Sequence, residues 1–278
     1  MLLAILSITT GATFAKTLFP LVGAPGTTCL RMAMAALILA LWQRVWRVRL
    51  NRESIRAGCL YGGALGGMSL LYYMAIARIP LGIALAFEFI GPLGVAIACS
   101  RRRSDLAWAA LAILGLGLLI PLRHGPETLN LTGVACALGA GFFWGAYILA
   151  GRRAGMAFGG QATAVGMIIA TAVVMPFGIA GAGNALLSTE ALLRGLGVAI
   201  ISSVIPFSLE MFALKRLPAR SYGILTSMEP AAGALLGLLI LGEQLSFAKW
   251  LGIAVIIAAS VGTTLGTGNG REKKPSAE

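Results

Sequence analysis

Apolar stretches of roughly 17–25 residues follow one another from one end of the chain to the other, separated by short gaps. Each stretch is long enough to cross a hydrocarbon core about 30 Å thick as a helix. The chain is 58% hydrophobic and only 12% charged, whereas about 25% of residues are charged in an ordinary soluble domain. Lipid must therefore surround most of the chain, and we expect an all-α polytopic membrane protein.

Turn residues divide the chain into ten expected transmembrane helices. Proline lacks an amide donor and restricts the residue before it, so it ends a helix where a loop can solvate the backbone. Breaks of this kind occur at 20–25, at Pro80, at Pro126 and at Pro218. The expected helices are 2–19, 25–42, 57–77, 81–99, 105–121, 131–150, 160–179, 194–214, 219–241 and 247–267.

The basic residues predict the orientation of these helices. Sixteen lysines and arginines fall in the gaps after the second, fourth, sixth and eighth expected helices and in the C-terminal tail. Only four, namely Arg78, Arg123, Arg194 and Lys249, fall on the other side. Because positively charged loops stay in the cytoplasm, we expect both termini to be cytoplasmic and residues 268–278 to be a disordered cytoplasmic tail.

The two halves of the chain share a pattern. Pro80 is followed twelve residues later by Pro92, and Pro218 is followed twelve residues later by Pro230. The pattern predicts a first five-helix repeat over 1–121 and a second over 122–267. Since five crossings are an odd number, the two repeats would be inverted, which is typical of transporters that bind their substrate between the repeats. Chance similarity between apolar helices is the alternative.

Five charged residues fall inside expected helices: Lys16, Arg31, Glu88, Glu210 and Glu229. A charge at mid-membrane costs about 2.5–3.5 kcal/mol on insertion scales, so each is a candidate for binding substrate or a coupling proton. Arg31 and Glu88 would both lie about 10 Å below the outer ends of their helices. They can pair with each other as a structural ion pair, or together hold a zwitterion.

An amino acid needs a cation for its carboxylate and an anion for its ammonium group. Arg31 can hold a carboxylate through two parallel hydrogen bonds, while Glu88 or Glu229 can accept an ammonium group or carry a coupling proton. Two of the five charges have simpler explanations. Lys16 can extend to the membrane surface, and Glu210 can form a local salt bridge with a nearby lysine.

Other features indicate a wet cavity less directly. Pro92 and Pro230 each free a backbone carbonyl one turn earlier, and such broken helices occur where they line water-filled space. We therefore expect both prolines to be helix-break hinges. Four aromatic residues are candidates for lining the cavity, although aromatic residues at membrane depth also serve as packing or interfacial anchors. They are Tyr72, Tyr73, Trp144 and Tyr147.

Several functional classes lack the residues they require. The net charge of +12 is spread over short gaps between apolar segments rather than over one face of a folded domain, which argues against nucleic-acid binding. The single histidine, His124, and four isolated cysteines offer no metal site and no hydrolytic triad. We expect neither an enzyme nor a cofactor. A passive channel or a structural membrane subunit is the remaining alternative to a transporter.

Long stretches of the sequence resemble a known family. They run from Leu18 to Arg31, from Pro80 through Glu88 to Pro92, and from Ser208 to Pro230. Together they resemble the EamA branch of the drug/metabolite transporter superfamily from about residue 10 to residue 265. At Lys16 the family would place an arginine. The chain also begins almost directly with its first helix, where the family would place a short charged lead, so we expect a shortened start.

The resemblance implies a function as well as a fold. It implies export of small zwitterionic amino acids of the threonine and homoserine kind across the bacterial inner membrane. Transport would proceed by alternating access, with protons as the coupling ion. Other metabolites or drug-like cations are alternative cargo, and the oligomeric state is left open.

Overall fold

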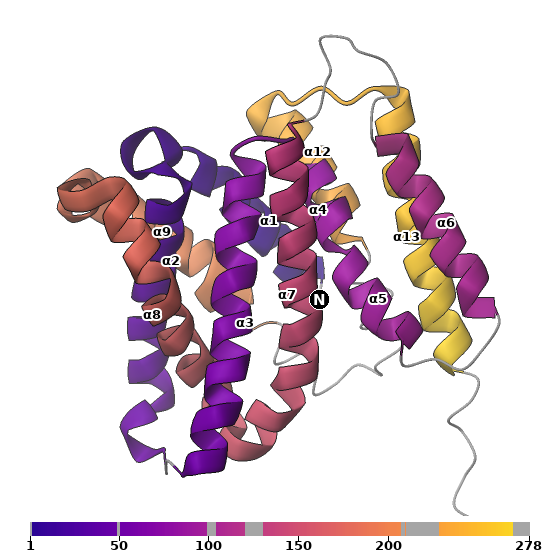
Figure 1. Cartoon of the computed structure of the whole chain (residues 1–278). Coiled ribbons are helices and arrows are strands. Elements are labelled where there is room, and N and C mark those ends of the chain that lie inside the picture. Colours follow the sequence, from indigo (N-terminus) through magenta and orange to yellow (C-terminus); the bar gives the residue numbers. More distant parts are fainter. Residues whose placement is uncertain are drawn as a thin grey trace, which may run out of the picture.

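The computed structural model describes residues 2–48, 51–98, 104–119, 130–206, 209 and 228–268. Every regular element in these ranges is a helix (Figure 1). The elements are α1 (Leu2–Lys16), α2 (Phe19–Gln43), η1 (Val45–Arg47), α3 (Arg52–Ile76), α4 (Leu81–Glu88), α5 (Ile90–Ala98), α6 (Ser104–Leu119), α7 (Leu131–Phe158), η2 (Gly159–Gln161), α8 (Ala162–Ala182), η3 (Gly183–Leu187), α9 (Thr189–Ala199), η4 (Ile200–Val204), α12 (Glu229–Leu241) and α13 (Phe247–Gly268).

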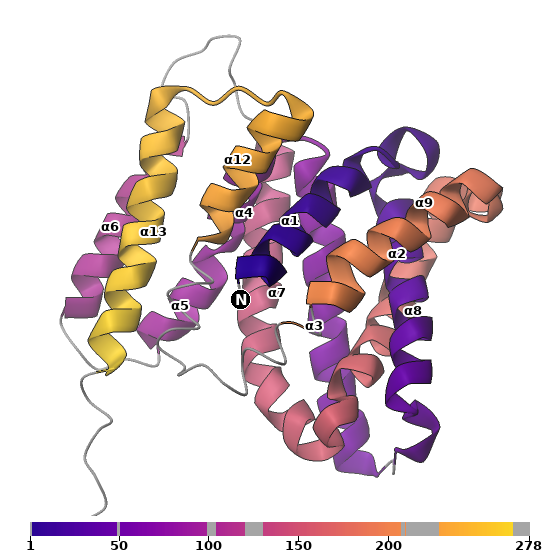
Figure 2. The ribbon, with the colours of Figure 1, turned by 180° about the vertical axis from the view of Figure 1, so that it is seen from behind.

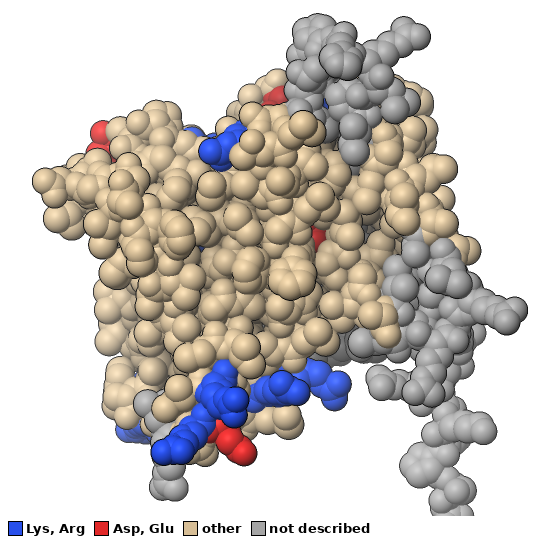
Figure 3. All heavy atoms as spheres, viewed as in Figure 1, with Lys and Arg blue, Asp and Glu red and all other residues tan. Residues whose placement is uncertain are grey.

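The helices are of a membrane-spanning kind. Within the described ranges, three helical segments are long and apolar enough to cross a bilayer: Phe19–Gln43, Arg52–Ile76 and the continuous stretch Leu131–Leu187. Shorter apolar helices are Leu2–Lys16, Leu81–Val95, Glu229–Leu241 and Phe247–Gly262. The face in Figure 3 is largely uncharged across its middle. Lysine and arginine gather at its lower end, where α3 begins and α7 ends. This surface suits a bilayer that covers the middle of the molecule.

Three pairs of helices from the two halves pack side by side: α2 with α8, α4 with α12, and α6 with α13 (Figures 1 and 2). Close approaches give the relative direction of each pair. In the first pair Gly26 lies against Ala182 and Cys29 lies against Gly178. In the third pair Gly115 lies against Ile256. Trp108 lies against Gly262 in the same pair. In the second pair Gly82 lies against Ala234, and Leu85 lies against Gly233. All three pairs are therefore antiparallel.

The remaining contacts join these pairs into one bundle. Helix α3 packs against α7 and α8, while α1 packs against α12 and against the segment formed by α9 and η4. The largest core cluster of the described residues draws on α1, α2, α3 and α4 in the first half of the chain and on α7, α9, α12 and α13 in the second. Residues of α4, η4 and α12 line one interior pocket, which is where the candidate site lies.

The expected break at 20–25 is confirmed, at Gly23. The first expected helix, 2–19, ends three residues early, because α1 ends at Lys16 and the chain turns before α2 begins at Phe19. Pro20 falls in the first turn of α2, where its missing amide would have had no intrahelical partner. Gly23 leaves helical geometry, with φ 66° and ψ 174°, and this kink divides Phe19–Gln43 into a short first piece and a longer second piece just before Pro25.

The expected helix 81–99 is interrupted at Phe89, which separates α4 from α5. Pro92 follows three residues later in the first turn of α5, and Pro230 lies in the first turn of α12. Both prolines thus stand just inside a helix start, where the missing donor costs least. Helix α7 continues to Phe158, eight residues past its expected end, so that Arg152 and Arg153 lie on its last turns. Glu210, Pro218 and the tail after residue 268 lie outside the described residues.

Candidate functional site

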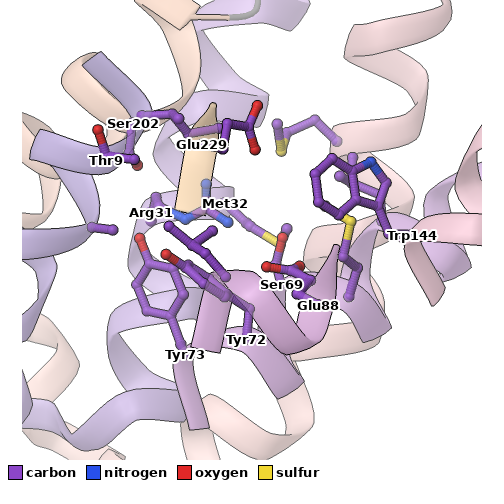
Figure 4. A pocket seen from close by; sticks show the side chains of 16 residues that line it. Thr9, Arg31, Met32, Ser69, Tyr72, Tyr73, Glu88, Trp144, Ser202 and Glu229 are labelled. Atoms are coloured by element: carbon purple, nitrogen blue, oxygen red, sulfur yellow. The ribbon is translucent and has the colours of Figure 1, made fainter. Parts of the chain in front are cut away.

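A cavity of about 90 Å³ lies where the interior ends of the helices meet. A single water needs roughly 10–15 Å³ by the same measure, so the cavity has room for several waters or a small organic molecule. Residues from both halves of the chain line it (Figure 4). They are Ile8, Thr9, Ala12, Arg31, Met32, Leu65, Met68, Ser69, Tyr72, Tyr73, Leu85, Glu88, Trp144, Met167, Ser202 and Glu229. We call this the central cavity.

Arg31 is the cation of the central cavity. It lies in the middle of α2, and only 6% of its surface is exposed. Its Nη1 donates a hydrogen bond of 2.8 Å to Ser203 Oγ, and its guanidinium carbon lies 5.0 Å from the ring centre of Tyr73. Both contacts favour a charged guanidinium in a fixed orientation. The Nε atom is buried and has no hydrogen-bond partner among the described residues.

Two carboxylates, Glu88 and Glu229, line the same cavity. Glu88 is the last residue of α4 and is 5% exposed, while Glu229 is the first residue of α12. Each therefore stands at a helix end inside the bundle, and the two come from different halves of the chain. Figure 4 shows Arg31 and Glu88 on opposite sides of the cavity.

A glycine face on α7 positions the break that carries Glu88. A Cβ atom on Gly141 would lie 2.5 Å from the carbonyl oxygen of Glu88, so only glycine allows this approach. Gly145, one turn later, lies against Val95 of α5. Close approach of backbones through small residues is the usual way helices pack in membranes. The Gly141–Gly145 face thus holds α7 against the end of α4 and the start of α5.

The candidate aromatic residues separate into two groups. Tyr72, Tyr73 and Trp144 line the central cavity, and Trp144 packs edge-on against Phe89 at a centroid distance of 5.6 Å. Tyr147 does not line it. Its ring stacks on Tyr61 with centroids 4.8 Å apart, and the two hydroxyl groups are 3.0 Å apart.

Lys16 also lies outside the central cavity. Its Nζ forms a salt bridge of 2.5 Å with Glu243 Oε1. The other carboxylate oxygen, Glu243 Oε2, accepts a hydrogen bond of 2.8 Å from the backbone amide of Leu81, at the start of α4. The sequence identified Lys16 as a candidate site residue but did not identify Glu243. In the structure they form a clamp that joins α1 and α4 to the end of α12.

Several polar residues of the cavity were missed in the sequence. Ser69, Thr9 and Ser202 line it, and Ser203 holds Arg31. Serine and threonine are common in membrane helices as packing residues, so their presence alone gave no signal. The adjacent pair at 202 and 203, inside an apolar run, is the one feature that could have marked this segment.

The central cavity presents charged groups of both signs to a ligand. Its walls are mainly apolar, and its charged groups are one guanidinium and two carboxyl groups. An isolated charge is costly at membrane depth, so groups of both signs facing one cavity favour a ligand that carries both signs. In the described residues no cluster of three or more His, Cys, Asp or Glu side chains could hold a metal ion.

A helical bundle of membrane type with charged groups around an interior cavity is an architecture typical of membrane transporters. Residues 131–265 match the model of the EamA-like transporter family. Curated relatives match almost the whole chain, and the chain belongs to this family.

The relatives include proteins with a named cargo. The threonine/homoserine exporter RhtA of Escherichia coli (strain K12) is 49% identical over 265 residues, which cover 95% of this chain and 90% of that protein. The same exporter from Salmonella typhimurium (strain LT2) has the same identity and coverage. An uncharacterized inner membrane transporter of Salmonella typhimurium, YicL, is 23% identical over 84% of this chain and 83% of its own length. A solved crystal structure matches the fold with a TM-score of 0.59 at 20% identity, covering 94% of this chain and 97% of that one.

Proposed function

We propose that the protein exports threonine, homoserine and similar small amino acids from the cytoplasm across the bacterial inner membrane. The observation that carries the proposal is the 49% identity, over 95% of the chain, to exporters named for these two amino acids. The central cavity supports it independently, since Arg31, Glu88 and Glu229 together supply the charges that a zwitterion requires.

We further propose that the chain crosses the membrane ten times as two inverted repeats, 1–121 and 122–267, with both termini in the cytoplasm. The antiparallel packing of α2 with α8, of α4 with α12 and of α6 with α13 supports this arrangement. Each pair joins corresponding helices of the two halves, and corresponding helices run in opposite directions only if one repeat is inverted. The basic side chains gathered at one end of the molecule favour that end as the cytoplasmic one (Figure 3).

The packing of helices that do not correspond to each other supports the same arrangement. In the proposed repeats α3 corresponds to the α9–η4 segment, and α7 corresponds to α1. The packing of α3 on α7 therefore has a counterpart in the packing of the α9–η4 segment on α1, and both packings occur. The packing of α4 on α7 likewise has a counterpart in that of α12 on α1, which also occurs. The central cavity lies between the halves, where inverted-repeat transporters bind their substrate.

Within the cavity, Arg31 would hold the carboxylate of the amino acid, and Glu88 and Glu229 would accept its ammonium group. When the amino acid leaves, the buried carboxyl group of Glu88 loses that counter-charge. Because an ionised carboxylate at membrane depth is costly without a counter-charge, a proton takes the place of the ammonium group. Exchange of amino acid for proton at the same carboxyl groups makes the protein an antiporter. An entering proton gains about 2.3 kcal/mol per 100 mV of membrane potential, which can drive export.

The proposal is tested by transport of radiolabelled threonine, homoserine and alanine in inside-out vesicles or proteoliposomes, with and without a pH gradient. We expect gradient-dependent threonine flux well above leakage from vesicles without protein. Glu88→Gln should abolish the dependence on the gradient. The matched control is Glu190→Gln, which removes an acid from an exposed ion pair with Arg194 and should leave the flux unchanged.

Other functions give different results in this assay. Flux that follows the concentration gradient and ignores the pH gradient, even in wild type, would indicate a passive channel. Absence of any amino-acid flux would refute the proposal and favour drug-like cations or another metabolite as cargo. A structural subunit would move no solute even as the wild-type protein. Its fold would also be unaltered by Glu88→Gln.

A further inference from the structure

The segment η4 (Ile200–Val204) is a π-helical turn that continues α9 into the bundle. Such turns are rare and occur frequently at functional sites, because they present side chains that a regular helix would turn elsewhere. Here the turn carries two consecutive serines, Ser202 and Ser203, which are 2% and 0% exposed. The contacts of these two buried hydroxyl groups with Arg31 and the central cavity indicate why the helix is distorted here.

Helix α1 locks the turn in place. The hydroxyl of Ser7 donates a hydrogen bond of 2.6 Å to the carbonyl oxygen of Ile201. Gly11 lies directly against Ser202, and any side chain at Gly11 would clash with it. Contacts to α1 therefore set the position of the turn without using the hydroxyl group of either serine.

The two serines serve different groups. Ser203 Oγ accepts the hydrogen bond from Arg31 Nη1, so this hydroxyl fixes the guanidinium. Ser202 lines the central cavity, and its Oγ is buried without a hydrogen-bond partner among the described residues. Since consecutive Cα atoms are about 3.8 Å apart, Ser202 stands next to the group that holds Arg31. Figure 4 shows Ser202 on the same side of the cavity as Arg31.

Two buried polar atoms at this place thus have no partner in the described part of the chain: Arg31 Nε and Ser202 Oγ. Folded proteins leave few buried polar groups unpaired, and those that remain call for an explanation. Both residues line one cavity, and both atoms can donate a hydrogen bond. A ligand group that satisfies them must accept two hydrogen bonds at neighbouring positions.

The contacts of the Arg31 guanidinium limit which ligand group can bind at Nε. Ser203 occupies Nη1 and the ring of Tyr73 lies against the guanidinium, so an acceptor at Nε must approach in the guanidinium plane. A carboxylate has two oxygens that can accept side by side in that plane, and its charge strengthens both bonds. A neutral hydroxyl group offers one oxygen and no charge.

We propose that Arg31 Nε and Ser202 Oγ form the carboxylate subsite of the transporter, with Ser203 as the residue that positions Arg31. The inference rests on the amino-acid cargo proposed above and adds a selection rule to it. The cargo must carry a free carboxylate, so that amino alcohols and simple amines of the same size are rejected. Ser202 is thereby a specificity-determining residue on the second half of the chain, facing Arg31 on the first.

The test compares threonine with threoninol, in which a CH₂OH group replaces the carboxylate. Each compound, unlabelled, competes against radiolabelled threonine in proteoliposomes containing the full-length protein. In wild type we expect threonine to compete at least tenfold better than threoninol. In Ser202→Ala the concentration of threonine needed for half-inhibition should rise roughly tenfold, the loss expected for one hydrogen bond to a charged group, while that of threoninol changes by less than about twofold.

Two further variants separate selectivity from general damage. Ser203→Ala should reduce the preference for threonine over threoninol as well, because Arg31 is no longer held, whereas a merely structural loss would weaken both compounds alike. Ser202→Cys keeps a side chain of similar size with a weak donor, and should show the same loss of preference even if Ser202→Ala folds poorly. Ser260→Ala, a buried serine of α13 away from the cavity, should keep the wild-type preference.

Three results would overturn the subsite while leaving the exporter intact. Equal competition by threonine and threoninol in wild type would exclude a carboxylate subsite. An unchanged preference in the Ser202 variants would remove Ser202 from it. Loss of preference for threonine over alanine, with the preference over threoninol retained, would assign Ser202 to the side-chain hydroxyl of the cargo instead. Failure of the exporter itself is distinct, since wild-type protein would then move no threonine.

Discussion

Gly141 offers a sharp test of how the bundle holds its carboxylate. In the variant Gly141→Ala, the new Cβ would lie 2.5 Å from the carbonyl oxygen of Glu88 and 3.3 Å from its Cα. These are backbone atoms, so no side-chain rotation relieves the contact. An ordinary contact begins at 3.4 Å, and α7 must therefore retreat from the end of α4 by about 0.9 Å.

The matched control lies on the same helix. A Cβ atom on Gly155 meets nothing within 4 Å, so Gly155→Ala changes the helix propensity without a clash. Alanine gains about 0.5–1 kcal/mol over glycine in a helix interior, and this gain is common to both variants. Overpacking costs about 1–3 kcal/mol, so Gly141→Ala should be less stable than Gly155→Ala by about that amount.

The difference in stability between the two variants is measured by thermal unfolding of the purified proteins in detergent, with size-exclusion chromatography as the readout of folded protein. About 1–3 kcal/mol corresponds to roughly 2–10 °C in a chain of this size. Because the retreat of α7 also displaces Glu88, threonine flux in proteoliposomes should fall in Gly141→Ala and stay at the wild-type level in Gly155→Ala. Equal melting temperatures and equal flux in the two variants would refute the packing of α7 against the break.

Three further predictions follow from the side-chain contacts. Arg31→Lys keeps the charge but loses the planar fork, so the half-saturating concentration for threonine should rise at least about tenfold; an unchanged value would show that charge alone suffices. Lys16→Gln and Glu243→Gln should couple by roughly 1 kcal/mol in a double-mutant cycle of thermal unfolding, because the pair is only partly exposed; strict additivity would contradict the clamp. Tyr147→Phe should lower stability by up to about 1 kcal/mol through loss of the bond to Tyr61, with unchanged threonine flux. A flux defect without a change in stability would place Tyr147 at the transport path.

The sequence predicted the helical class and most helix positions because the bilayer imposes a simple requirement of apolar length. It was less accurate at helix ends, which short-range contacts decide. The break expected at 20–25 is present at Gly23, but α1 already ends at Lys16 rather than at residue 19. Pro92 predicted a freed carbonyl one turn earlier, and the helix is interrupted in that turn, at Phe89. The sixth expected helix was to end at residue 150, whereas α7 continues to Phe158.

Charges within the membrane were the most informative sequence signal for the site. Arg31, Glu88 and Glu229 were selected from the cost of burying a charge, and the structure places all three on one cavity. The same rule selected Lys16, which pairs instead with Glu243, 227 positions away in the sequence. The cost of burial identifies residues that need a partner, but only the three-dimensional arrangement shows whether that partner is another side chain or the cavity.

Polar residues without charge could not be assigned from the sequence. Ser202 and Ser203 owe their roles to the π-turn and to the packing of Gly11, which depend on contacts between helices distant in sequence. Trp144 and Tyr147 are three positions apart on α7, yet one lines the cavity and the other stacks on Tyr61. Apolar periodicity is weak in a helix surrounded by lipid and protein, so it does not separate such neighbours.

The most direct measurement is of proton movement caused by threonine. Proteoliposomes that contain the protein and a trapped pH indicator receive a threonine gradient with no imposed pH gradient. If amino acid and proton exchange at the carboxyl groups of one cavity, threonine flowing one way will move protons the other way, and Glu88→Gln will remove the indicator signal. Threonine flux without any pH change in wild type, or a full signal in Glu88→Gln, would contradict exchange at this site.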